Sequence, residues 1–198
     1  MPPERFKDYN IILASGSPRR AELLAKLDIE FSVSATEGSE DFNDNLSPEE
    51  IAKNLASRKS SAVAAHYTAG DVIIGADTIV VCEGRILNKP SDSQQAFEFL
   101  TLLSGRSHEV ITGVAIHFEG KLYTFATTTE VRFGSMESND MKYYIDKYKP
   151  FDKAGGYGIQ EWIGMAGVSE IRGCYYNVMG LPLYDLYTKL KEILKLTY

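Results

Sequence analysis

Hydrophobic and polar positions along the chain alternate between a two-residue period and a period of three to four residues, which predicts strands interleaved with helices. The first apolar run, Ile11-Ile12-Leu13-Ala14, is short and continuous, as expected of a buried strand. Strands are predicted over residues 10–14, 31–35, 71–81, 85–89, 108–118 and 121–133. Helices are predicted over residues 18–27, 48–66, 92–103, 138–147 and 182–196. This order predicts an α/β fold built on a mixed sheet.

Local signals mark several ends of these elements. Ser47-Pro48-Glu49-Glu50 has the pattern of a capping box with proline at the first helical position. Glu83-Gly84 and Glu119-Gly120 are predicted to form turns between paired strands. Gly105 is predicted to end the helix over residues 92–103.

The composition narrows the class of protein. The chain has 198 residues, of which 44% are hydrophobic, enough for a single domain over residues 1–198 or for one core with two lobes. It has no run of about 18 apolar residues and no signal-peptide pattern, so we expect a cytoplasmic protein. Two cysteines provide neither a disulfide framework nor metal-ligand spacing. The net charge of −6 argues against a broad surface for nucleic acid or membrane.

The segment Ser15-Gly16-Ser17-Pro18-Arg19-Arg20 follows the first predicted strand and begins the first predicted helix. Ser17 is predicted as the N-cap residue and Pro18 as the first helical residue. Arg19 and Arg20 then occupy the first turn, where the helix dipole disfavours cations and a capping box would have an acid at position 20. Two guanidinium groups beside backbone N–H groups are instead typical of an anion site. The segment therefore predicts a phosphate-binding site.

A carboxylate interrupts the apolar strand predicted over residues 71–81. An unpaired buried carboxylate is costly, so Asp77 needs a cation, a metal or a hydrogen-bond partner. If Glu83-Gly84 form a two-residue turn, Thr78 faces Lys89 and Asp77 lies diagonally beside it. Because successive side chains point to opposite faces, a bend or a strand end is needed for all three to converge. A structural ion pair between Asp77 and Lys89 is the alternative to a catalytic role.

Lys59 interrupts an apolar stripe on the helix predicted over residues 48–66. The stripe otherwise consists of Ala52, Leu55, Ala56 and Val63. By helix position alone, a lysine that extends past its neighbours to solvent is the simpler interpretation. Alongside Arg19 and Arg20, a lysine at the rim of a phosphate pocket becomes plausible.

Two loops carry further candidate residues. Residues 152–160 combine three glycines with Lys153 and Gln160; glycines let a ligand approach the backbone, and an amide can read the edge of a base. The same pattern fits an ordinary tight connection. In the acidic loop, Glu37, Glu40 and Asp41 could bind Mg²⁺ together with phosphate oxygens, or simply be solvated. The three histidines show no metal or catalytic spacing and are expected to be structural: His66, His108 and His117.

A series of motifs from residue 11 to about residue 190 resembles the Maf family of nucleoside triphosphate pyrophosphatases. The opening motif is Leu13-Ala14-Ser15-Gly16-Ser17-Pro18-Arg19-Arg20 with Glu22-Leu23-Leu24, and the central one is Gly75-Ala76-Asp77-Thr78 with Lys89-Pro90. The others are Gly105-Arg106 with His108, Val110 and Thr112-Gly113-Val114; Asp152-Lys153-Ala154-Gly155 with Tyr157-Gly158-Ile159-Gln160; and Asn177-Val178 with Gly180-Leu181-Pro182-Leu183. Each motif alone is weak, and their common order makes the resemblance specific.

The resemblance implies an activity and a fold. The family hydrolyses a nucleoside triphosphate between the α and β phosphates, which yields the monophosphate and pyrophosphate, and requires a divalent metal, Mg²⁺ or Mn²⁺. Its members are credited with removing non-standard or excess nucleotides. The implied fold is an elongated mixed β-sheet with flanking helices and two lobes around a central cleft, often in a homodimer. The residues that separate the dTTP/UTP branch from the 7-methyl-GTP branch fall at Arg19, Thr78 and Gln160, and all three match the dTTP/UTP branch.

The resemblance also implies a role for each candidate residue. Asp77 would act as general base and, with Glu37, as a metal ligand. The substrate would be bound by Ser15, Arg19, Arg20, Lys59, Thr78, Lys89, Lys153 and Gln160. Four residues depart from the usual family pattern: Asp28, Asn88 and Glu161 replace glycines, and Gly156 replaces an alanine.

Two other functions fit the same anion pocket. One is a non-catalytic, nucleotide-binding regulator of cell division, which would not need a buried carboxylate at position 77. The other is a phosphatase that releases orthophosphate directly.

Overall fold

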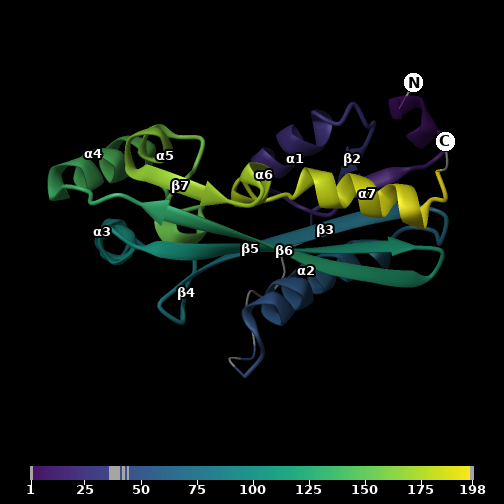
Figure 1. The fold of residues 1–198 in the computed structure, drawn as a ribbon. Coiled ribbons are helices and arrows are strands. Elements are labelled where there is room, and N and C mark those ends of the chain that lie inside the picture. Colours follow the sequence, from purple (N-terminus) through teal and green to yellow (C-terminus); the bar gives the residue numbers. More distant parts are fainter. Residues whose placement is uncertain (1, 36–40, 42, 44, 197–198) are drawn as a thin grey trace. The chain divides into compact units, whose positions relative to one another are not determined.

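The computed structural model describes residues 2–35, 41, 43 and 45–196, so the predicted metal ligand Glu37 and its neighbour Glu40 lie outside the described residues (Figure 1). The strands are β1 (Ile11–Leu13), β2 (Ser32–Val33), β3 (Val72–Cys82), β4 (Arg85–Leu87), β5 (Ser107–Phe118), β6 (Lys121–Phe133) and β7 (Val168–Arg172). The α-helices are α1 (Pro18–Ala25), α2 (Pro48–Ala64), α3 (Ser93–Leu103), α4 (Ser138–Tyr148), α5 (Trp162–Gly167), α6 (Tyr175–Val178) and α7 (Leu183–Ile193). Two short 3-10 helices are η1 (Pro2–Phe6) and η2 (Ala154–Gly156).

The strands form a mixed sheet in the order β2-β1-β3-β5-β6-β7, with β4 paired to β3. Strand β1 runs parallel to β2 and β3, whereas β4 and β7 are antiparallel to β3 and β6. Each strand and helix predicted from the sequence is present, with ends that differ by a few residues. The predicted mixed α/β fold is therefore confirmed.

The chain divides into two compact units. Unit 1 comprises residues 1–77, 112–127 and 180–198, and unit 2 comprises residues 78–111 and 128–179. Strands β3, β5 and β6 contribute residues to both units, and the boundary within β3 falls between Asp77 and Thr78.

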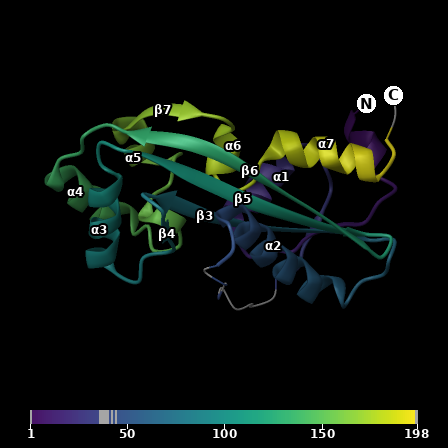
Figure 2. The same ribbon diagram turned by 60° about the horizontal axis from the view of Figure 1, so that its bottom comes forward.

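In unit 1, helices cover both faces of the strands. Helix α2 lies on one face, and α1 and α7 lie on the other, in both ribbon views (Figures 1 and 2). Strand β1 is buried along its whole length, as its continuous apolar run predicts. Part of the core forms where Ile12 and Ile73 of the sheet pack against Val63 of α2. This packing joins β1 and β3 to helix α2.

Two glycines let helix α2 lie unusually close to the sheet. A Cβ atom at Gly75 would come within 2.6 Å of the Ala56 carbonyl oxygen, and one at Gly113 within 2.2 Å of the Ala52 carbonyl carbon. Real side chains cannot occupy such positions, so each glycine is required by a close approach of two backbones. The α2 residues that face the sheet are thereby brought near β3.

Unit 2 has its own core, in which helices α3 and α4 pack on the ends of the long strands. Phe133, Leu100 and Tyr144 are fully buried within it. The turn between β3 and β4 consists of Glu83 and Gly84, both with positive φ, and pairs Cys82 with Arg85, as the sequence predicts.

The sequence patterns missed three elements of unit 2. Helices α5 and α6 span only six and four residues, too few to show a helical period. Strand β7 is partly exposed along its length and lacks the apolar run of a buried strand. Strand β7 forms despite its weak local pattern because it pairs with the longer strand β6.

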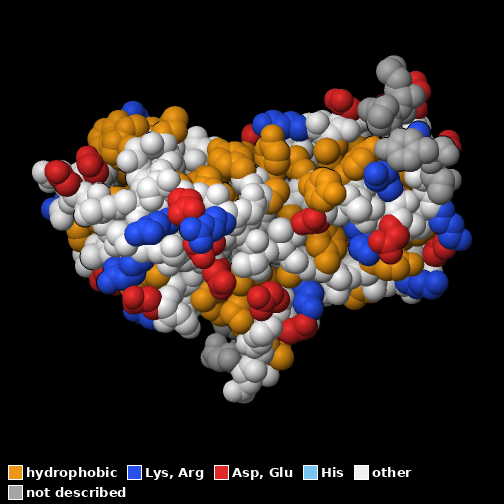
Figure 3. Space-filling view, in the orientation of Figure 1, with side chains coloured by type: hydrophobic (Ala, Val, Ile, Leu, Met, Phe, Trp, Pro, Cys, Tyr) orange, Lys and Arg blue, Asp and Glu red, His pale blue; other side chains and the backbone are white. Residues whose placement is uncertain are grey.

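The surface carries charges of both signs. On the face shown in Figure 3, Lys and Arg side chains are interspersed with Asp and Glu, and hydrophobic side chains are also visible. Exposed large apolar side chains include Met165 of α5 and Tyr184 of α7. Among the described residues, every helix is too short or too polar to cross a membrane.

Candidate active site

The first candidate group in unit 1 lies where β1 leads into α1. Pro18 begins the helix, and Ser17 is the N-cap residue, as predicted, although its side chain makes no capping hydrogen bond. Instead, the Ser17 N–H donates to the Oγ of Ser15 at 3.3 Å. The Ser15 hydroxyl, which is buried, thus lies at the amide-rich end of the helix.

Arg20 is fixed beside the same hydroxyl. Its Nη1 donates to Ser15 Oγ at 3.3 Å, and its Nε donates to the carbonyl oxygen of Gly180 at 2.8 Å. Arg19 precedes it in the first turn of α1 and is half-buried. The corner therefore combines a hydroxyl, backbone N–H groups and an anchored guanidinium group, which together suit a phosphate.

The second candidate group in unit 1 is an ion pair between Lys59 of α2 and Asp77 of β3. The Nζ of Lys59 contacts Oδ1 of Asp77. Asp77 is only 8% exposed, and the side chain of Lys59 is largely covered as well. The sequence position of Lys59 most simply predicted a side chain that extends to solvent. The structure instead shows it directed to Asp77, where α2 packs closely against β3 at Gly75.

The sequence suggested Lys89 as the structural partner of Asp77 and did not anticipate Lys59. Asp77 and Lys59 are 18 positions apart, on different elements, so no local pattern links them. Strand β3 also continues without a break through Asp77 and Thr78. The strand end that would have let Asp77, Thr78 and Lys89 converge is therefore absent.

Unit 2 carries the other predicted residues. Thr78 is half-buried on β3, and Lys89 is exposed just after β4. The observed β3–β4 register is the predicted one, but the ladder ends at the pair Val80–Leu87, before Thr78 and Lys89. The Gly155 N–H donates to the Asn88 carbonyl oxygen at 3.1 Å, which ties the glycine-rich segment to the residue before Lys89.

Lys153, at the start of the glycine-rich segment, lies between two carboxylates. Its Nζ donates to Asp152 Oδ1 at 2.8 Å and lies 3.1 Å from Glu161 Oε1. Gly158 leaves room for this arrangement, since a Cβ there would meet the Glu161 carboxyl carbon at 2.8 Å. Gln160, half-buried, lies between Gly158 and Glu161 in the same segment. Glu161 was noticed in the sequence only as a departure from the family pattern.

Three ionisable side chains in or against the segment have displaced pKa values: His108, Tyr144 and Tyr157. Burial lowers the pKa of His108 to about 4. Burial raises the pKa of Tyr157, and burial together with the hydrogen bond to Glu161 raises the pKa of Tyr144. All three groups are therefore uncharged at neutral pH.

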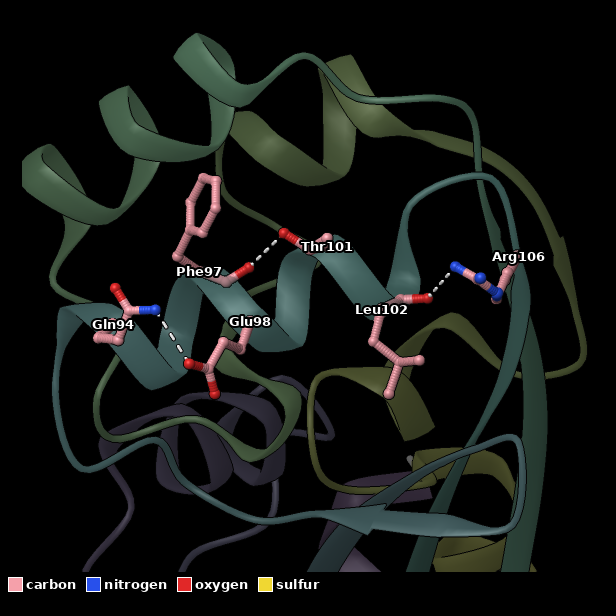
Figure 4. Close-up of a pocket in the computed structure, with 6 residues that line it drawn as sticks. All are labelled: Gln94, Phe97, Glu98, Thr101, Leu102 and Arg106. Carbon is pink, nitrogen blue, oxygen red and sulfur yellow. Dashed lines mark hydrogen bonds between the residues drawn. The ribbon is translucent and has the colours of Figure 1, made fainter.

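A separate open hollow of about 410 Å³ runs along helix α3 in unit 2 (Figure 4). It is lined by Gln94, Phe97, Glu98, Thr101, Leu102 and Arg106. In the close-up, the Gln94 amide donates to Glu98 and the Arg106 guanidinium donates to the Leu102 carbonyl oxygen. None of the residues predicted to bind substrate contributes to it.

A comparison with solved structures shows which fold this chain resembles. The fold is similar to that of the Ham1 protein of Staphylococcus aureus, with a TM-score of 0.52 and 16% sequence identity over 92% of this chain and 98% of that one. At this identity, the likeness concerns the fold alone.

A family model described as "Maf-like protein" matches residues 10–193, and the chain belongs to this family. Three similar curated proteins are each named dTTP/UTP pyrophosphatase. The Phocaeicola vulgatus protein is 46% identical over 96% of this chain and 99% of its own length. The Porphyromonas gingivalis protein (strain ATCC 33277) is 42% identical over 96% of both chains, and that of Flavobacterium psychrophilum is 43% identical over 94% and 96%. The family resemblance of the sequence motifs is thus confirmed.

Proposed function

We propose that this protein hydrolyses dTTP and UTP to the nucleoside monophosphate and pyrophosphate. One water molecule is consumed, its oxygen joins the α phosphorus, and pyrophosphate leaves with the α–β bridging oxygen. Support comes from membership of the Maf-like family and from the names of relatives that are 42–46% identical. The observation that carries the proposal is the ion pair between buried Asp77 and partly buried Lys59, because two apolar elements are interrupted by complementary charges at one point.

In this proposal, Asp77 is the general base. Its carboxylate accepts a proton from the attacking water, a role that requires a nearby carboxylate held in a fixed position. Lys59 holds the carboxylate in place and supplies positive charge beside the phosphates. At the start of α1, Ser15, Arg19 and Arg20 bind phosphate oxygens and neutralise the charge that develops on the departing pyrophosphate.

The roles proposed for residues of unit 2 concern binding. Thr78 and Gln160 bind the pyrimidine, since a hydroxyl and an amide offer both hydrogen-bond donors and acceptors. Lys89 helps to hold the triphosphate, and Lys153 contributes positive charge toward the substrate. The two carboxylates beside Lys153 orient its ammonium group and also moderate its charge.

A divalent cation, Mg²⁺ or Mn²⁺, fits the proposed chemistry. Among the described residues, no three His, Cys, Asp or Glu side chains gather into a metal site of their own. Mg²⁺, however, commonly uses one or two carboxylates together with substrate phosphate oxygens, and the buried Asp77 provides such an oxygen donor. We propose that Asp77 and Glu37 hold the ion, which would neutralise negative charge on the phosphates when bound.

The alternative of a non-catalytic regulator of cell division is not favoured, because the similar curated proteins carry the name of an enzyme. We also propose that the protein acts in the cytoplasm, as a homodimer, and without nucleic acid as a partner. The acidic balance of the chain, with a net charge of −6, supports the last point.

A substrate panel tests the proposed function. The protein is incubated with UTP, dTTP, CTP, GTP and 7-methyl-GTP in the presence of Mg²⁺ or Mn²⁺, and pyrophosphate and orthophosphate are measured separately. We expect pyrophosphate, with dTTP and UTP as the best substrates. Orthophosphate as the first product would identify a phosphatase, and binding without turnover would identify the regulator. A preference for 7-methyl-GTP would overturn the roles given to Arg19, Thr78 and Gln160.

A further inference from the structure

The centre of the glycine-rich segment is attached to a buried cluster of three rings. The hydroxyl of Tyr157 is hydrogen-bonded to Nε2 of His108 at 2.6 Å. The imidazole stacks on Phe133 with centroids 5.6 Å apart, and the Tyr157 ring meets both rings edge-on. All three side chains are at most 5% exposed. Because a buried phenol hydroxyl requires a partner, His108 is what permits Tyr157 to sit there.

The imidazole is held as a neutral group. Its Nδ1 is buried and has no hydrogen-bond partner, so a second N–H on a protonated ring would be unsatisfied. Burial accordingly lowers the pKa of His108. The ring is therefore uncharged at neutral pH, and among the described residues its polar contact is the Tyr157 hydroxyl.

A second phenol holds the next residue of the segment. The hydroxyl of Tyr144, on α4, accepts the Gly158 N–H at 3.0 Å and donates to Oε2 of Glu161. The other oxygen of Glu161 lies 3.1 Å from Nζ of Lys153. One chain of contacts therefore runs from α4 through Glu161 to a residue assigned to substrate binding.

These side-chain contacts add to the short helix η2 and the backbone hydrogen bonds that also hold the segment. Gly155 and Gly156 both have φ of +71°, so the three-residue helix η2 that contains them is irregular. The Gly158 N–H is satisfied by a side chain and not by a backbone carbonyl. Apart from the bond to Asn88, the backbone hydrogen bonds of the segment among the described residues are local, such as that from the Gly156 N–H to the Lys153 carbonyl oxygen, so side-chain anchors on β5 and α4 supply additional rigidity.

We propose that the Tyr144 and Tyr157 hydroxyls pin the glycine-rich segment from two sides, and that His108 and Glu161 are positioning residues that hold these hydroxyls. The inference rests on the proposed function, since it is Lys153 and Gln160 that the segment presents to a pyrimidine nucleotide. A pinned segment keeps both side chains in the geometry that binds substrate, which avoids the cost of ordering them during binding.

Single-atom and isosteric variants test this inference. Tyr157→Phe and Tyr144→Phe each remove one hydroxyl, and His108→Leu removes its partner. His108→Gln places an amide where Nε2 lies and so preserves the hydrogen bond. Thr129→Val is the matched control, because it removes a fully buried hydroxyl of unit 2 that bonds Cys174 and Asn177 and not the segment. KM and kcat for UTP, the preference for UTP over GTP and the melting temperature are measured for each.

We expect Tyr157→Phe, Tyr144→Phe and His108→Leu to raise KM for UTP by roughly tenfold and to weaken the preference for UTP over GTP. Their kcat should change much less than their KM. His108→Gln should restore KM to within about twofold of the parent value. Thr129→Val should lower the melting temperature with KM and preference unchanged.

The contrary outcomes are distinct. If the phenylalanine and leucine variants lose melting temperature as the control does, with KM and preference unchanged, the hydroxyls only stabilise the fold and the inference fails. Failure of His108→Gln to restore KM would refute the assigned hydrogen bond. If the parent protein releases no pyrophosphate from UTP, the proposed function itself fails; the anchoring is then tested by hydrogen exchange, and an unchanged rate at the Gly158 amide in Tyr144→Phe would refute it.

Discussion

At the scale of single residues, Asp77 is a buried carboxylate in contact with the partly buried ammonium group of Lys59. Removing such groups from water is costly, and replacement of a buried ion pair by apolar residues is often neutral or stabilising. An apolar pair would therefore serve the packing of β3 and α2 about as well as these two charges do. A catalytic role explains why they stand in an otherwise apolar interface.

Replacement of Asp77 by Asn tests that role. Because an amide cannot accept the proton of the attacking water, kcat for UTP should fall at least about a hundredfold. The folded state should persist, since Asn can still accept a hydrogen bond from Lys59. The control is Asp71→Asn, which removes a carboxylate from the turn before β3. Near-normal turnover by Asp77→Asn, measured with the control alongside, would exclude Asp77 from the mechanism.

His108 carries a prediction about pH. Its folded-state pKa of about 4 lies below the unfolded value of about 6.5, so the unfolded chain takes up a proton first as the pH falls. Burial of neutral His108 therefore does not lower the free energy of unfolding above about pH 6.5, and it lowers that free energy progressively between about pH 6.5 and 4. Urea unfolding should reveal a loss of about 2 kcal/mol from this group between pH 7 and 5. In His108→Gln this part of the loss should vanish, and an equal loss in both proteins would contradict the assignment.

At the scale of elements, the contact between helix α2 and the sheet determines where the ammonium group of Lys59 lies. Gly75 and Gly113 remove the two side chains that would otherwise keep α2 at a greater distance. The same close approach buries the apolar stripe of α2 and directs Lys59, the charged residue within that stripe, toward β3.

Gly113→Ala tests the importance of this contact. The new methyl group would overlap the α2 backbone at Ala52, so the helix must shift. We expect a loss of about 1–3 kcal/mol in the free energy of unfolding, with a fall in kcat because Lys59 moves relative to Asp77. Gly70→Ala is the control, because its Cβ would meet nothing closer than 4.0 Å. Unchanged stability and turnover in Gly113→Ala would contradict the close packing.

Much of this organisation could be predicted from the sequence, and the exceptions have physical causes. Strand β1, the Ser47 N-cap and the Glu83-Gly84 turn are local features, and local patterns predicted them. Of the predicted capping box, the structure shows the bond from the Glu50 N–H to Ser47, while the Glu50 carboxylate contacts Lys53. The pair Lys59–Asp77 joins two elements through tertiary packing, which no local period encodes. The glycines at positions 75 and 113 were the available signal, because a glycine inside a strand often marks a close approach of another backbone.

The candidate site was predicted less completely than the fold. Ser15 and Arg20 lie together as their shared motif suggested, and the carbonyl of Gly180 that holds Arg20 was not anticipated. Tyr144 and Glu161 were missed because neither their residue types nor their spacing in the sequence marks them as partners. Tertiary hydrogen bonds of this kind depend on where α4 packs.

At the scale of the whole molecule, the proposed roles divide along the chain. Most residues proposed to act on the phosphates belong to unit 1 (Ser15, Arg19, Arg20, Lys59 and Asp77), and Lys89 belongs to unit 2. Those proposed to bind the base, Thr78 and Gln160, belong to unit 2. Substitutions in the first group should chiefly lower kcat, and those in the second should chiefly alter KM and the choice of nucleotide.

Hydrolysis of UTP in ¹⁸O-labelled water, with Mg²⁺ present and the products analysed by mass spectrometry, tests the central claim most directly. Attack of water on the α phosphorus predicts UMP that carries one ¹⁸O atom and pyrophosphate that carries none. Label in the pyrophosphate would place the attack at the β phosphorus, and UDP with orthophosphate would mean a different reaction altogether. Either result, or the absence of turnover, would contradict the function derived for this chain.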